Sequence, residues 1–516
     1  MRVLTPAQMR EAERRTIEDH GVPSLRLMER AGEQVVAAIE AHLAGRPGAA
    51  AVLCGRGNNG GDGWVVARLL GERDRDVLGV LFGTAGDVAG DARTNLERAR
   101  QAGIPIVEVT GEDDWRRCRP RLDARLVVDA ILGTGQKRPL TGLLATVADD
   151  VNAMTGTVVS IDLPSGILSD LSRRADPCLR PVLTVTLGAP KLALALRPEP
   201  AGQVVVADIG IPAAVIAKLD APRIGLLAAG EMRSSIPSRH PESHKGDYGR
   251  VAIVAGSRGK TGAACLAGLG ALRAGAGLVT VATPASCLDV VAREPEYMTL
   301  GLPDENGVAT GNGLDALLAG PWDVMAAGPG LGTGRGCRTI VQALLDRPAR
   351  GPLVLDADAL TACAEQPERL RGHPDAPVVI TPHPGEMARL AATGVADVQR
   401  DRVGVAHRFA ADHGVHVVLK GARTVIAAPD GAVWINTTGN PGMAKGGSGD
   451  VLTGVVAAWL AQVRDVGAAV ALAVHLHGLA GDLAVRETGE TGLLARDIAR
   501  RLGPAVVELA GGGRDR

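Results

Sequence analysis

The sequence predicts an α/β fold with two doubly wound domains, in which helices cover both faces of a largely parallel sheet. Short apolar runs of strand length alternate with longer helical segments along most of the chain, which is the order of elements in such sheets. Glycine-rich loops follow several of the apolar runs, and the pattern loosens only once, around residues 219–248. The 516 residues and an apolar content of 46% are enough for two large cores.

Two helices and then five strands are predicted in the first half. Thr5 can cap a helix that has Pro6 at its first position, and Gln8 can complete a capping box. A second helix is predicted after Ser24, because apolar residues recur there on one side. The predicted strands are Ala50–Cys54, Val77–Phe82, Ile104–Val109, Leu126–Asp129 and Val158–Asp162.

The loosened stretch separates the two halves. It contains RSSIPSRHPESHKGDYG, whose Ser, Pro, His and charged residues are typical of a linker. We therefore place one domain at residues 1–220 and a second at residues 230–516. In the second domain a hairpin is predicted over residues 424–436, turned at Pro429-Asp430-Gly431. Its other predicted strands and its last two helices are Val251–Ala255, Leu278–Ala282, Asp323–Ala327, Leu353–Leu355, Val378–Ile380, Val415–Leu419, Asp450–Gln462 and Val466–Val485.

Charge and composition argue against several classes of protein. The net charge of −1, without long runs of like charge, does not favour a nucleic-acid or anionic-membrane partner. The first residues lack the apolar core of a signal peptide, and Arg273 and glycines interrupt the most apolar stretch. We therefore expect a cytoplasmic protein. We also expect the protein to form a homo-oligomer. Seven scattered cysteines without a CxxC pair favour reduced thiols over zinc or disulfides.

A glycine-rich loop follows the first predicted strand. Gly55, Gly57 and Gly60 match the GxGxxG pattern, in which glycines let a phosphate approach the backbone at a helix N-terminus. A dinucleotide-binding dehydrogenase also needs an acidic residue at the end of the next strand, to hold a ribose. That strand ends LFGT at residues 81–84, without an acid. An ordinary dehydrogenase is therefore disfavoured.

Two more loops, at residues 129–139 and 161–166, follow predicted strands in the same half. Open α/β sheets bind ligands at the carboxyl ends of their strands, so the three loops are expected to meet. Asn59, Asp129 and Ser165 carry oxygen donors that suit a hard cation. Each alone would be read as a turn or a cap. Together they predict a binding site.

NNGGDG, DAxxGTGxxRPLxG and IDLPSG in these loops resemble the NAD(P)H-hydrate epimerase family over most of residues 1–215. The resemblance implies a Rossmann-like fold that interconverts the R and S epimers of hydrated NADH and NADPH, with potassium held by Asn59, Asp129 and Ser165. Asp162 would be the acid/base group that opens and closes the hydrated ring at C6. Lys191 either assists it or lies at the surface. The implied substrate contacts are Asn58, Asn59, Gly60, Gly61, Asp62, Gly133, Thr134, Gly135, Gln136, Lys137, Arg138, Pro139 and Asp162.

The most specific pattern in the second half is NPGMAKGGSGD at residues 440–450. Glycines and small residues there precede a helix expected to begin near Asp450, so successive N–H groups can bind a phosphate. Asp450 can take a proton from a hydroxyl that attacks this phosphate. The structural alternative is a turn capped by Asp450. Gly259-Lys260-Thr261 does not end a P-loop, because Val254 stands where its first glycine is required.

HKGDYGRV, TGAACLAGLGALRAGAGLVTVATP, AAGPGLG, DADAL, TPHPGEM, KGARTVI and GMAKGGSGD together resemble ADP-dependent NAD(P)H-hydrate dehydratases of the ribokinase-like superfamily, over about residues 240–500. The resemblance implies that Asp450 deprotonates the C6 hydroxyl, which takes a phosphoryl group from ADP while Mg²⁺ bridges the phosphates. Loss of phosphate then leaves NAD(P)H and AMP. For His383, a packed neutral histidine is the alternative to a ligand contact. The implied nucleotide contacts are Lys420, Gly421, Ala422, Arg423, Thr424 and Gly449, and the implied substrate contacts are Ala264, Gly330, His383 and Asp450.

Two other functions stay open from the sequence. The chain could be a small-molecule kinase of the ribokinase-like superfamily, with a non-catalytic nucleotide-binding domain in its first half. A kinase would release a stable phosphorylated product, whereas a dehydratase releases free phosphate. The first half could also be a regulatory binding module without catalysis, although Asp162 and the cation-binding residues favour an enzyme.

Overall fold

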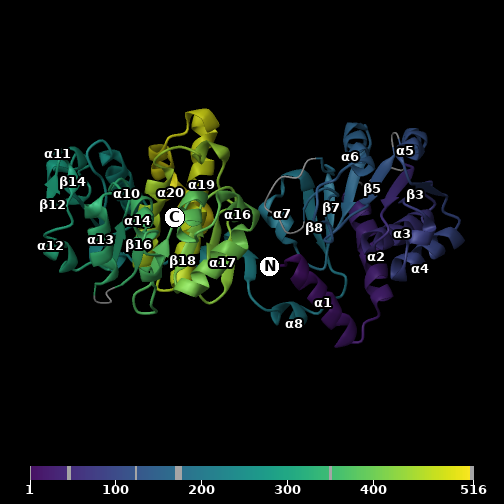
Figure 1. Cartoon of the computed structure of the whole chain (residues 1–516), viewed down its shortest axis with the longest axis horizontal. Coiled ribbons are helices and arrows are strands. Elements are labelled where there is room, and N and C mark those ends of the chain that lie inside the picture. Colours follow the sequence, from purple (N-terminus) through teal and green to yellow (C-terminus); the bar gives the residue numbers. More distant parts are fainter. Residues whose placement is uncertain (1, 43–47, 123–124, 169–176, 348–350, 512–516) are drawn as a thin grey trace. The chain divides into compact units, whose positions relative to one another are not determined.

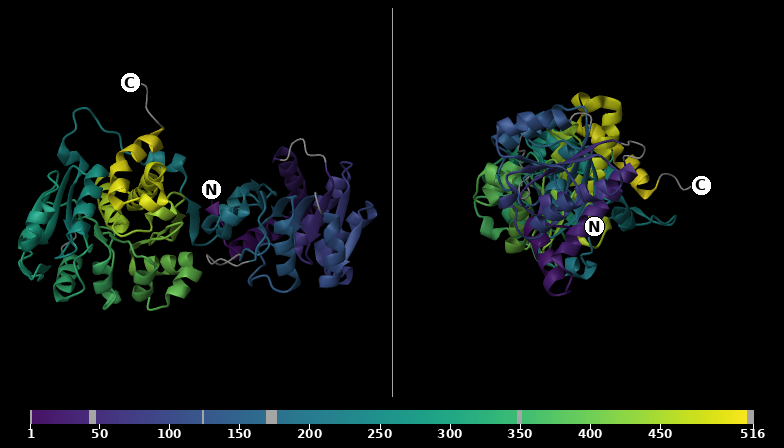
Figure 2. Two further views of the ribbon diagram at one scale, coloured as in Figure 1. Left: turned by 90° about the horizontal axis from the view of Figure 1, so that it is seen from above. Right: turned by 90° about the vertical axis from the view of Figure 1, so that its right-hand side faces the viewer.

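A computed structural model of the chain describes residues 2–42, 48–122, 125–168, 177–347 and 351–511 (Figure 1). The contacts within the chain divide it into two compact units, residues 1–223 and 224–516. This division falls inside the stretch where the sequence pattern loosens. Both units are α/β, as predicted, and Figure 2 shows their elements from two further directions.

The first unit contains a parallel sheet in the order β4-β3-β2-β5-β6-β7-β8. The strand order reverses between β2 and β5, and such a switch point is where open α/β sheets bind ligands. The strands are β1 (Arg2–Val3), β2 (Ala50–Cys54), β3 (Val77–Phe82), β4 (Ile106–Val109), β5 (Leu126–Ala130), β6 (Thr157–Ile161), β7 (Leu183–Leu187) and β8 (Gln203–Ala207). The helices are α1 (Pro6–Glu18), α2 (Ser24–His42), α3 (Asn58–Gly71), α4 (Gly90–Gln101), α5 (Glu112–Cys118), α6 (Leu143–Ala153), α7 (Leu192–Leu196) and α8 (Ala213–Ala217).

The predicted elements of this unit are confirmed, and three strands were missed. The capping box of α1 forms: the Gln8 N–H donates to the Thr5 hydroxyl oxygen at 3.2 Å, and the Thr5 N–H donates to Gln8 Oε1 at 3.1 Å. One of them is the two-residue β1. The others are β7 and β8, and the only helices between these two are the five-residue α7 and a short 3₁₀ turn. Because a helix of usual length is absent between them, the alternation of strand and helix did not reveal them.

The second unit contains the sheet order β9-β20-β19-β18-β17-β16-β15-β10-β11-β12. Its strands pair in parallel from β12 to β18, and the predicted hairpin adds β19 and β20 antiparallel. The order reverses between β10 and β15, so this unit also has a switch point. The strands are β9 (Arg223–Leu226), β10 (Arg250–Val254), β11 (Leu278–Pro284), β12 (Met298–Leu302), β13 (Asp304–Glu305), β14 (Val308–Ala309), β15 (Val324–Ala327), β16 (Leu353–Leu355), β17 (Val378–Ile380), β18 (His416–Leu419), β19 (Val425–Ala427) and β20 (Ala432–Ile435).

Twelve α-helices are described in this unit. They are α9 (Ala229–Ser234), α10 (Thr261–Arg273), α11 (Leu288–Val291), α12 (Asp315–Leu318), α13 (Arg335–Leu345), α14 (Asp358–Cys363), α15 (Pro384–Leu390), α16 (Val395–Arg400), α17 (Arg402–His413), α18 (Ser448–Gln462), α19 (Val466–Gly492) and α20 (Ala495–Ala510). Part of the stretch interpreted as a linker therefore forms β9 and α9. β9 joins the second sheet, where the Leu227 N–H donates to the Ile435 carbonyl oxygen at 3.0 Å.

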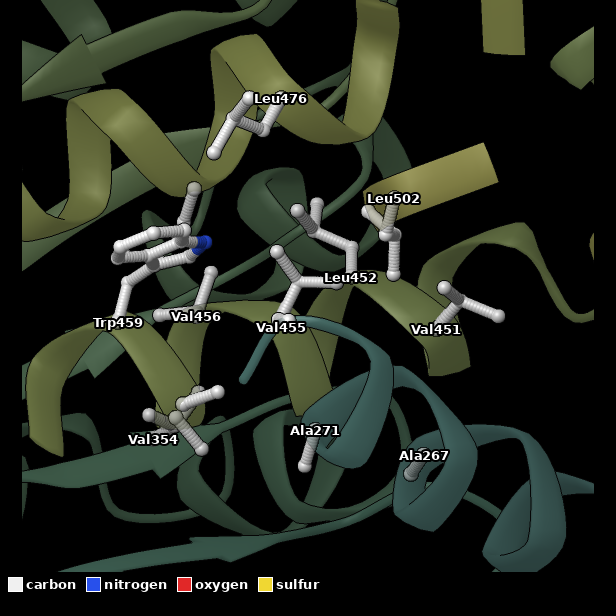
Figure 3. Close-up of a cluster of buried hydrophobic side chains, with 14 of the residues drawn as sticks. Ala267, Ala271, Val354, Val451, Leu452, Val455, Val456, Trp459, Leu476 and Leu502 are labelled. Carbon is white, nitrogen blue, oxygen red and sulfur yellow. The ribbon is translucent and has the colours of Figure 1, made fainter. Parts of the chain in front are cut away.

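Close packing between α10 and α18 holds the glycine-rich loop at the start of α18. A Cβ added to Gly454 would lie 2.0 Å from the Ala267 carbonyl oxygen, and one added to Gly270 would lie 2.5 Å from that of Val451. Only glycine permits this approach. Figure 3 shows the resulting core, in which Val455 and its neighbours on α18 lie among Ala271 of α10, Leu476 of α19 and Leu502 of α20. The first half of α18 is therefore anchored by α10.

The helix α19 has the length and hydropathy of a membrane span. It is the one such helix in the part of the chain that the structure describes, and 72% of its most apolar window is buried inside the protein. It packs against α18 and α20, so burial in the core of the second unit accounts for its apolar composition. All seven cysteines are free, and six of them are buried.

Candidate active sites

A cavity of about 550 Å³ opens at the carboxyl edge of the first sheet, beside its switch point. Its wall combines three of the predicted loops with one face of α1. The lining residues are Met9, Arg10, Glu13, Gly55, Arg56, Gly57, Asn58, Asn59, Asp62, Phe82, Ile131, Leu132, Gly133, Thr134, Gly135, Gln136, Leu144, Asp162, Leu187 and Lys191. The cavity has both apolar walls and convergent charged groups, as substrate sites do.

Asp162 follows β6 and is held in the cavity wall by several contacts. Its φ of +65° is rare for a residue with a side chain, and such backbone strain clusters at functional sites. The Thr134 N–H donates to its Oδ2 at 3.3 Å, and the Leu187 N–H donates to its Oδ1 at 3.4 Å. Lys191 Nζ lies 2.6 Å from Oδ1. The carboxylate therefore has a fixed orientation and a direct counter-ion.

Lys191 is only 1% exposed, so the interpretation of this residue as a surface lysine is wrong. The first residues of the chain cover it: the Leu4 N–H donates to the Pro190 carbonyl oxygen, and the Leu192 N–H donates to that of Leu4. Its ammonium also donates to the Leu187 carbonyl oxygen. A buried ammonium needs such partners, because an unpaired charge in a protein interior is very costly.

Two further carboxyl groups line the same cavity. Burial raises the pKa of Glu13, and the negative charge of Asp162 raises it further, against Lys191 and Arg10. Burial also raises the pKa of Asp62, followed by the charges of Asp162 and Glu13. Asp62 is 8% exposed, and no described residue forms a hydrogen bond with its carboxyl group. Glu13 was missed because α1 belongs to no glycine-rich motif; the capping residues at its start indicated only a helix.

The three residues expected to bind potassium differ in their surroundings. Asp129 accepts hydrogen bonds from the Ser165 hydroxyl at 2.6 Å, the Ser165 N–H and Ser160 hydroxyl at 2.8 Å, and the Ile131 N–H at 3.2 Å. Burial raises the pKa of Asp129, and these bonds oppose the shift. The amide of Asn59 is buried with neither its oxygen nor its nitrogen bonded to a described residue. An unpartnered buried amide oxygen can accept a further partner, and a monovalent cation is one that such an oxygen suits.

The expected substrate contacts in this unit fall into two groups. Asn58, Asn59, Asp62, Gly133, Thr134, Gly135, Gln136 and Asp162 line the cavity. Gly60 and Gly61 are buried behind it, and a Cβ on Gly60 would lie 1.9 Å from the Gly55 carbonyl oxygen. They shape the loop. Gln136 joins two loops, since its Oε1 accepts from the Gly166 N–H at 2.8 Å. The exposed Lys137, Arg138 and Pro139 lie outside the cavity wall.

In the second unit, the helix α18 begins at Ser448, two residues before the expected start. Gly447 caps it in the left-handed region, with a φ of +93°. The alternative in which Asp450 is only a cap is therefore wrong. Asp450 lies in the first turn, among the free N–H groups that attract anions. A Cβ on Gly449 would lie 3.4 Å from Lys420 Nζ, so the predicted lysine and the glycine-rich loop do meet.

Lys420 joins the acidic groups around Asp450. Its Nζ lies 2.6 Å from Asp356 Oδ1 and 3.8 Å from Glu386 Oε2. The other oxygen of Asp356 accepts from the Thr453 hydroxyl of α18 at 2.7 Å. Burial raises the pKa of Asp450 to about 6, and the charge of Asp356 contributes while Lys420 opposes it. Asp356 is 1% exposed and was not among the predicted site residues, although DADAL was noted as a motif.

The remaining predicted contacts of this unit are not equally accessible. The His383 side chain is 52% exposed, and its Nδ1 accepts from the Gly385 N–H at 3.0 Å at the start of α15, so the packed alternative is wrong. Gly330 has a φ of +68° and lies close to Lys260. Ala264 has no exposed surface. It packs into the core from α10, and its contact with the substrate stays a prediction.

A buried arginine supports the expected nucleotide loop at residues 420–424. Arg402 donates to the carbonyl oxygens of Leu419 at 3.1 Å and Lys420 at 3.4 Å, and also to that of Ala422. The loop needs this support because Gly421 and Arg423 both have positive φ. Sequence reasoning missed Arg402, since an arginine in a helix is usually read as exposed. Among the residues that the structure describes, no three His, Cys, Asp or Glu side chains are grouped so that they could hold a metal ion.

Comparison with known proteins covers both units. A family model described as NAD(P)H-hydrate dehydratase matches residues 251–503, and one described as YjeF-related protein N-terminus matches residues 24–193. The bifunctional NAD(P)H-hydrate repair enzyme Nnr of Moorella thermoacetica is 45% identical over 96% of this chain and 95% of its own length. Its Escherichia coli counterpart is 33% identical, over 95% of this chain and 91% of its own. A crystal structure of the ADP/ATP-dependent NAD(P)H-hydrate dehydratase from Bacillus subtilis, co-crystallised with ATP and Mg²⁺, covers 55% of this chain and 98% of its own, with 36% identity and a TM-score of 0.49.

Proposed function

Because the chain belongs to the family of bifunctional NAD(P)H-hydrate repair enzymes, we propose that its two units repair hydrated NADH and NADPH in succession. The first unit interconverts the R and S epimers, and the second dehydrates the S epimer with ADP, releasing AMP and phosphate. The observation that carries this function is the similarity of nearly the whole chain to repair enzymes, with charged groups converging in each unit. A kinase with a non-catalytic first half does not explain why the bifunctional repair enzymes match this chain over nearly its whole length.

The second unit supplies what dehydration requires. Hydroxide is a poor leaving group, so the C6 hydroxyl must be converted to a phosphate before it departs. Asp450 accepts the hydroxyl proton, and the N–H groups at the start of α18 bind the phosphoryl group that ADP transfers. Lys420 Nζ lies beside this loop and can neutralise phosphate charge. Magnesium bound to the nucleotide would supply further neutralisation among these acidic residues. The lone pair on the ring nitrogen then expels the phosphate, and loss of a proton from C5 restores the C5–C6 double bond of NAD(P)H.

For epimerisation, the first unit supplies a carboxylate that is held in a fixed orientation. Asp162 is placed by two N–H groups and by Lys191, and it can accept the C6 hydroxyl proton as the ring opens. Asn59, Asp129 and Ser165 would hold potassium, which would orient the polar groups of the substrate. The unpartnered amide of Asn59 supports this assignment, because buried polar atoms in native proteins are almost always bonded.

A single assay tests the proposed function. Hydrated NADH containing both epimers is mixed with the enzyme, ADP and Mg²⁺, and absorbance is followed at the reduced-nicotinamide band. We expect recovery of both epimers together with stoichiometric release of AMP and phosphate. Recovery of the S epimer alone would support the dehydratase activity and contradict the epimerase activity. Accumulation of a stable phosphorylated product would instead identify a small-molecule kinase.

We predict that the two units work independently. Residues 224–516 expressed alone should dehydrate the S epimer at the rate of the whole chain and leave the R epimer untouched, because Asp450, Lys420 and Asp356 all lie in that unit. The measurement is absorbance recovery from the two purified epimers. A folded but inactive fragment, judged by circular dichroism and ADP binding, would show that the second site needs residues of the first unit.

We also predict that potassium activates epimerisation only. Without potassium, in a tetramethylammonium buffer, interconversion of the epimers should slow while dehydration of the S epimer is unaffected. Asn59→Ala should raise the potassium concentration for half-maximal activity at least tenfold, equivalent to about 1.4 kcal/mol of binding. Its side-chain amide makes no bond to a described residue, so folding should be little affected. An unchanged potassium response in Asn59→Ala would remove this residue from the cation site.

A further inference from the structure

One wall of the epimerase cavity comes from α1, which lies outside every glycine-rich motif. Met9, Arg10 and Glu13 of this helix line the cavity. The helix is held firmly, by the capping box at Thr5 and by the backbone bonds that join Leu4 to the residues on either side of Lys191. The firmly held helix α1 therefore places Glu13 in the lining of the same cavity as Asp162.

Glu13, Asp62 and Asp162 together place three carboxyl groups in this cavity, whereas Lys191 is paired with only one of them. Burial and the charge of Asp162 raise the pKa of Glu13, although Lys191 and Arg10 oppose this. Burial, Asp162 and Glu13 raise the pKa of Asp62. Like charges held this close in a buried space do not all ionise. In this cluster Asp162 is the carboxyl group paired with a lysine, whereas the surroundings of Glu13 and Asp62 favour the protonated form of each.

Epimerisation by ring opening needs both kinds of group. In the opening step the C6–N1 bond breaks, so the hydroxyl oxygen must lose a proton and the ring nitrogen must gain one. A single carboxylate cannot hold and release both protons at once. Environments that separate the pKa values of two neighbouring carboxyls are how proteins assign an acid and a base.

We propose that Glu13 is the second catalytic group of the epimerase and protonates the ring nitrogen while Asp162 deprotonates the C6 hydroxyl. This inference rests on the proposed epimerase function. Asp162 takes the hydroxyl proton, the C6–O bond becomes a carbonyl, and the electrons of the C6–N1 bond pass to N1 with the proton from Glu13. Rotation about C5–C6 exposes the other carbonyl face. Closure reverses each transfer, so both carboxyls return to their initial state without a further reactant.

Glu13 rather than Asp62 is assigned as the donor because of their positions. Asp62 lies in α3 just after its first turn, is only 8% exposed and belongs to the glycine-rich motif that lines the cavity. Glu13 is half-buried on the wall contributed by α1, so its carboxyl is more accessible to a substrate. The charged groups that act on Glu13 are Asp162, which favours its protonated form, and Lys191 and Arg10, which oppose it.

The test is carried out on the full chain with Glu13→Gln and a control, Glu11→Gln, on the same helix. Glu11 faces solvent in ion pairs with Arg14 and Arg15 and does not line the cavity. We expect Glu13→Gln to lower kcat for epimerisation about 10²- to 10⁴-fold, while both variants dehydrate the S epimer normally. Glu13→Asp, which keeps a carboxyl group, should recover part of the rate.

The pH profile separates proton donation from a structural role. Epimerisation by the wild-type protein should decline at high pH, where Glu13 loses its proton, and Glu13→Gln should lack this decline. Epimerisation by Glu13→Gln within about threefold of the wild type, or a slow variant that keeps the same decline, would overturn the assignment of Glu13. A wild-type protein that dehydrates the S epimer but never interconverts epimers would instead overturn the epimerase function itself.

Discussion

Asp450→Asn is expected to lower the single-turnover rate of dehydration by about 10² to 10⁴, which corresponds to roughly 3 to 5.5 kcal/mol of barrier. Asparagine has the size of aspartate and can accept hydrogen bonds, but it cannot take a proton from the C6 hydroxyl. Gly447, and not Asp450, caps α18, so the helix loses no cap in the variant. ADP affinity and thermal stability should therefore stay close to those of the wild type.

The pH dependence of the wild-type protein gives a second view of the same residue. Burial and the neighbouring Asp356 raise the pKa of Asp450 to about 6. A base works only when it is ionised, so kcat/KM for dehydration should rise with pH and level off above about pH 6. This limb should be absent from the residual activity of Asp450→Asn. Because kcat/KM reports the free enzyme, it is the quantity to compare with the nucleotide-free structure.

Asp465→Asn provides the matched control for this experiment. Asp465 caps α19 by accepting from the Ala468 N–H at 2.7 Å, so the same chemical change is made at a position with a purely structural role. Asparagine caps about as well as aspartate, and turnover should be unaffected. Near-normal single-turnover dehydration by Asp450→Asn would remove Asp450 from the mechanism and leave only the binding groups of the loop.

Asp162→Asn is expected to lower epimerisation by about 10² to 10⁴ and to leave dehydration of the S epimer unchanged. Asparagine tolerates the positive φ at this position, so the backbone should be retained. The change leaves Lys191 buried without its counter-ion, however, and breaking a buried pair in this way costs about 3 to 5 kcal/mol of folding stability. Loss of activity must therefore be separated from loss of stability.

The double variant Asp162→Asn with Lys191→Met makes that separation. It removes the unpaired ammonium as well, and apolar replacement of a buried ion pair is often close to neutral for stability. We expect the melting temperature to recover while epimerisation stays slow. Epimerisation restored along with stability would show that Asp162 serves only to hold Lys191. Epimerisation by a folded Asp162→Asn single variant at the wild-type rate would exclude Asp162 as the proton acceptor.

The sequence alone determined the features that depend on neighbouring residues. Apolar runs such as Ala50–Cys54 became strands because their length and flanking glycines leave few alternatives. The glycine-rich loops followed strand ends, so both sites could be placed at sheet edges from the topology of parallel α/β folds. Asp162 and Asp450 could be identified from the sequence because each lies within one of the loop motifs that follow the strands.

Only the tertiary structure decided which distant side chains meet at the sites. Glu13 and Lys191 join Asp162 in one cavity, yet neither lies in a glycine-rich motif, and an isolated helix gives no sign of the charge it will face. Asp356 and Arg402 became buried partners of Lys420 and its loop in the same way. Burial, and with it the raised pKa of Asp450, arises from contacts between segments far apart in the chain. Local sequence patterns therefore specify the backbone of each loop, whereas long-range packing sets the charge and exposure of its side chains.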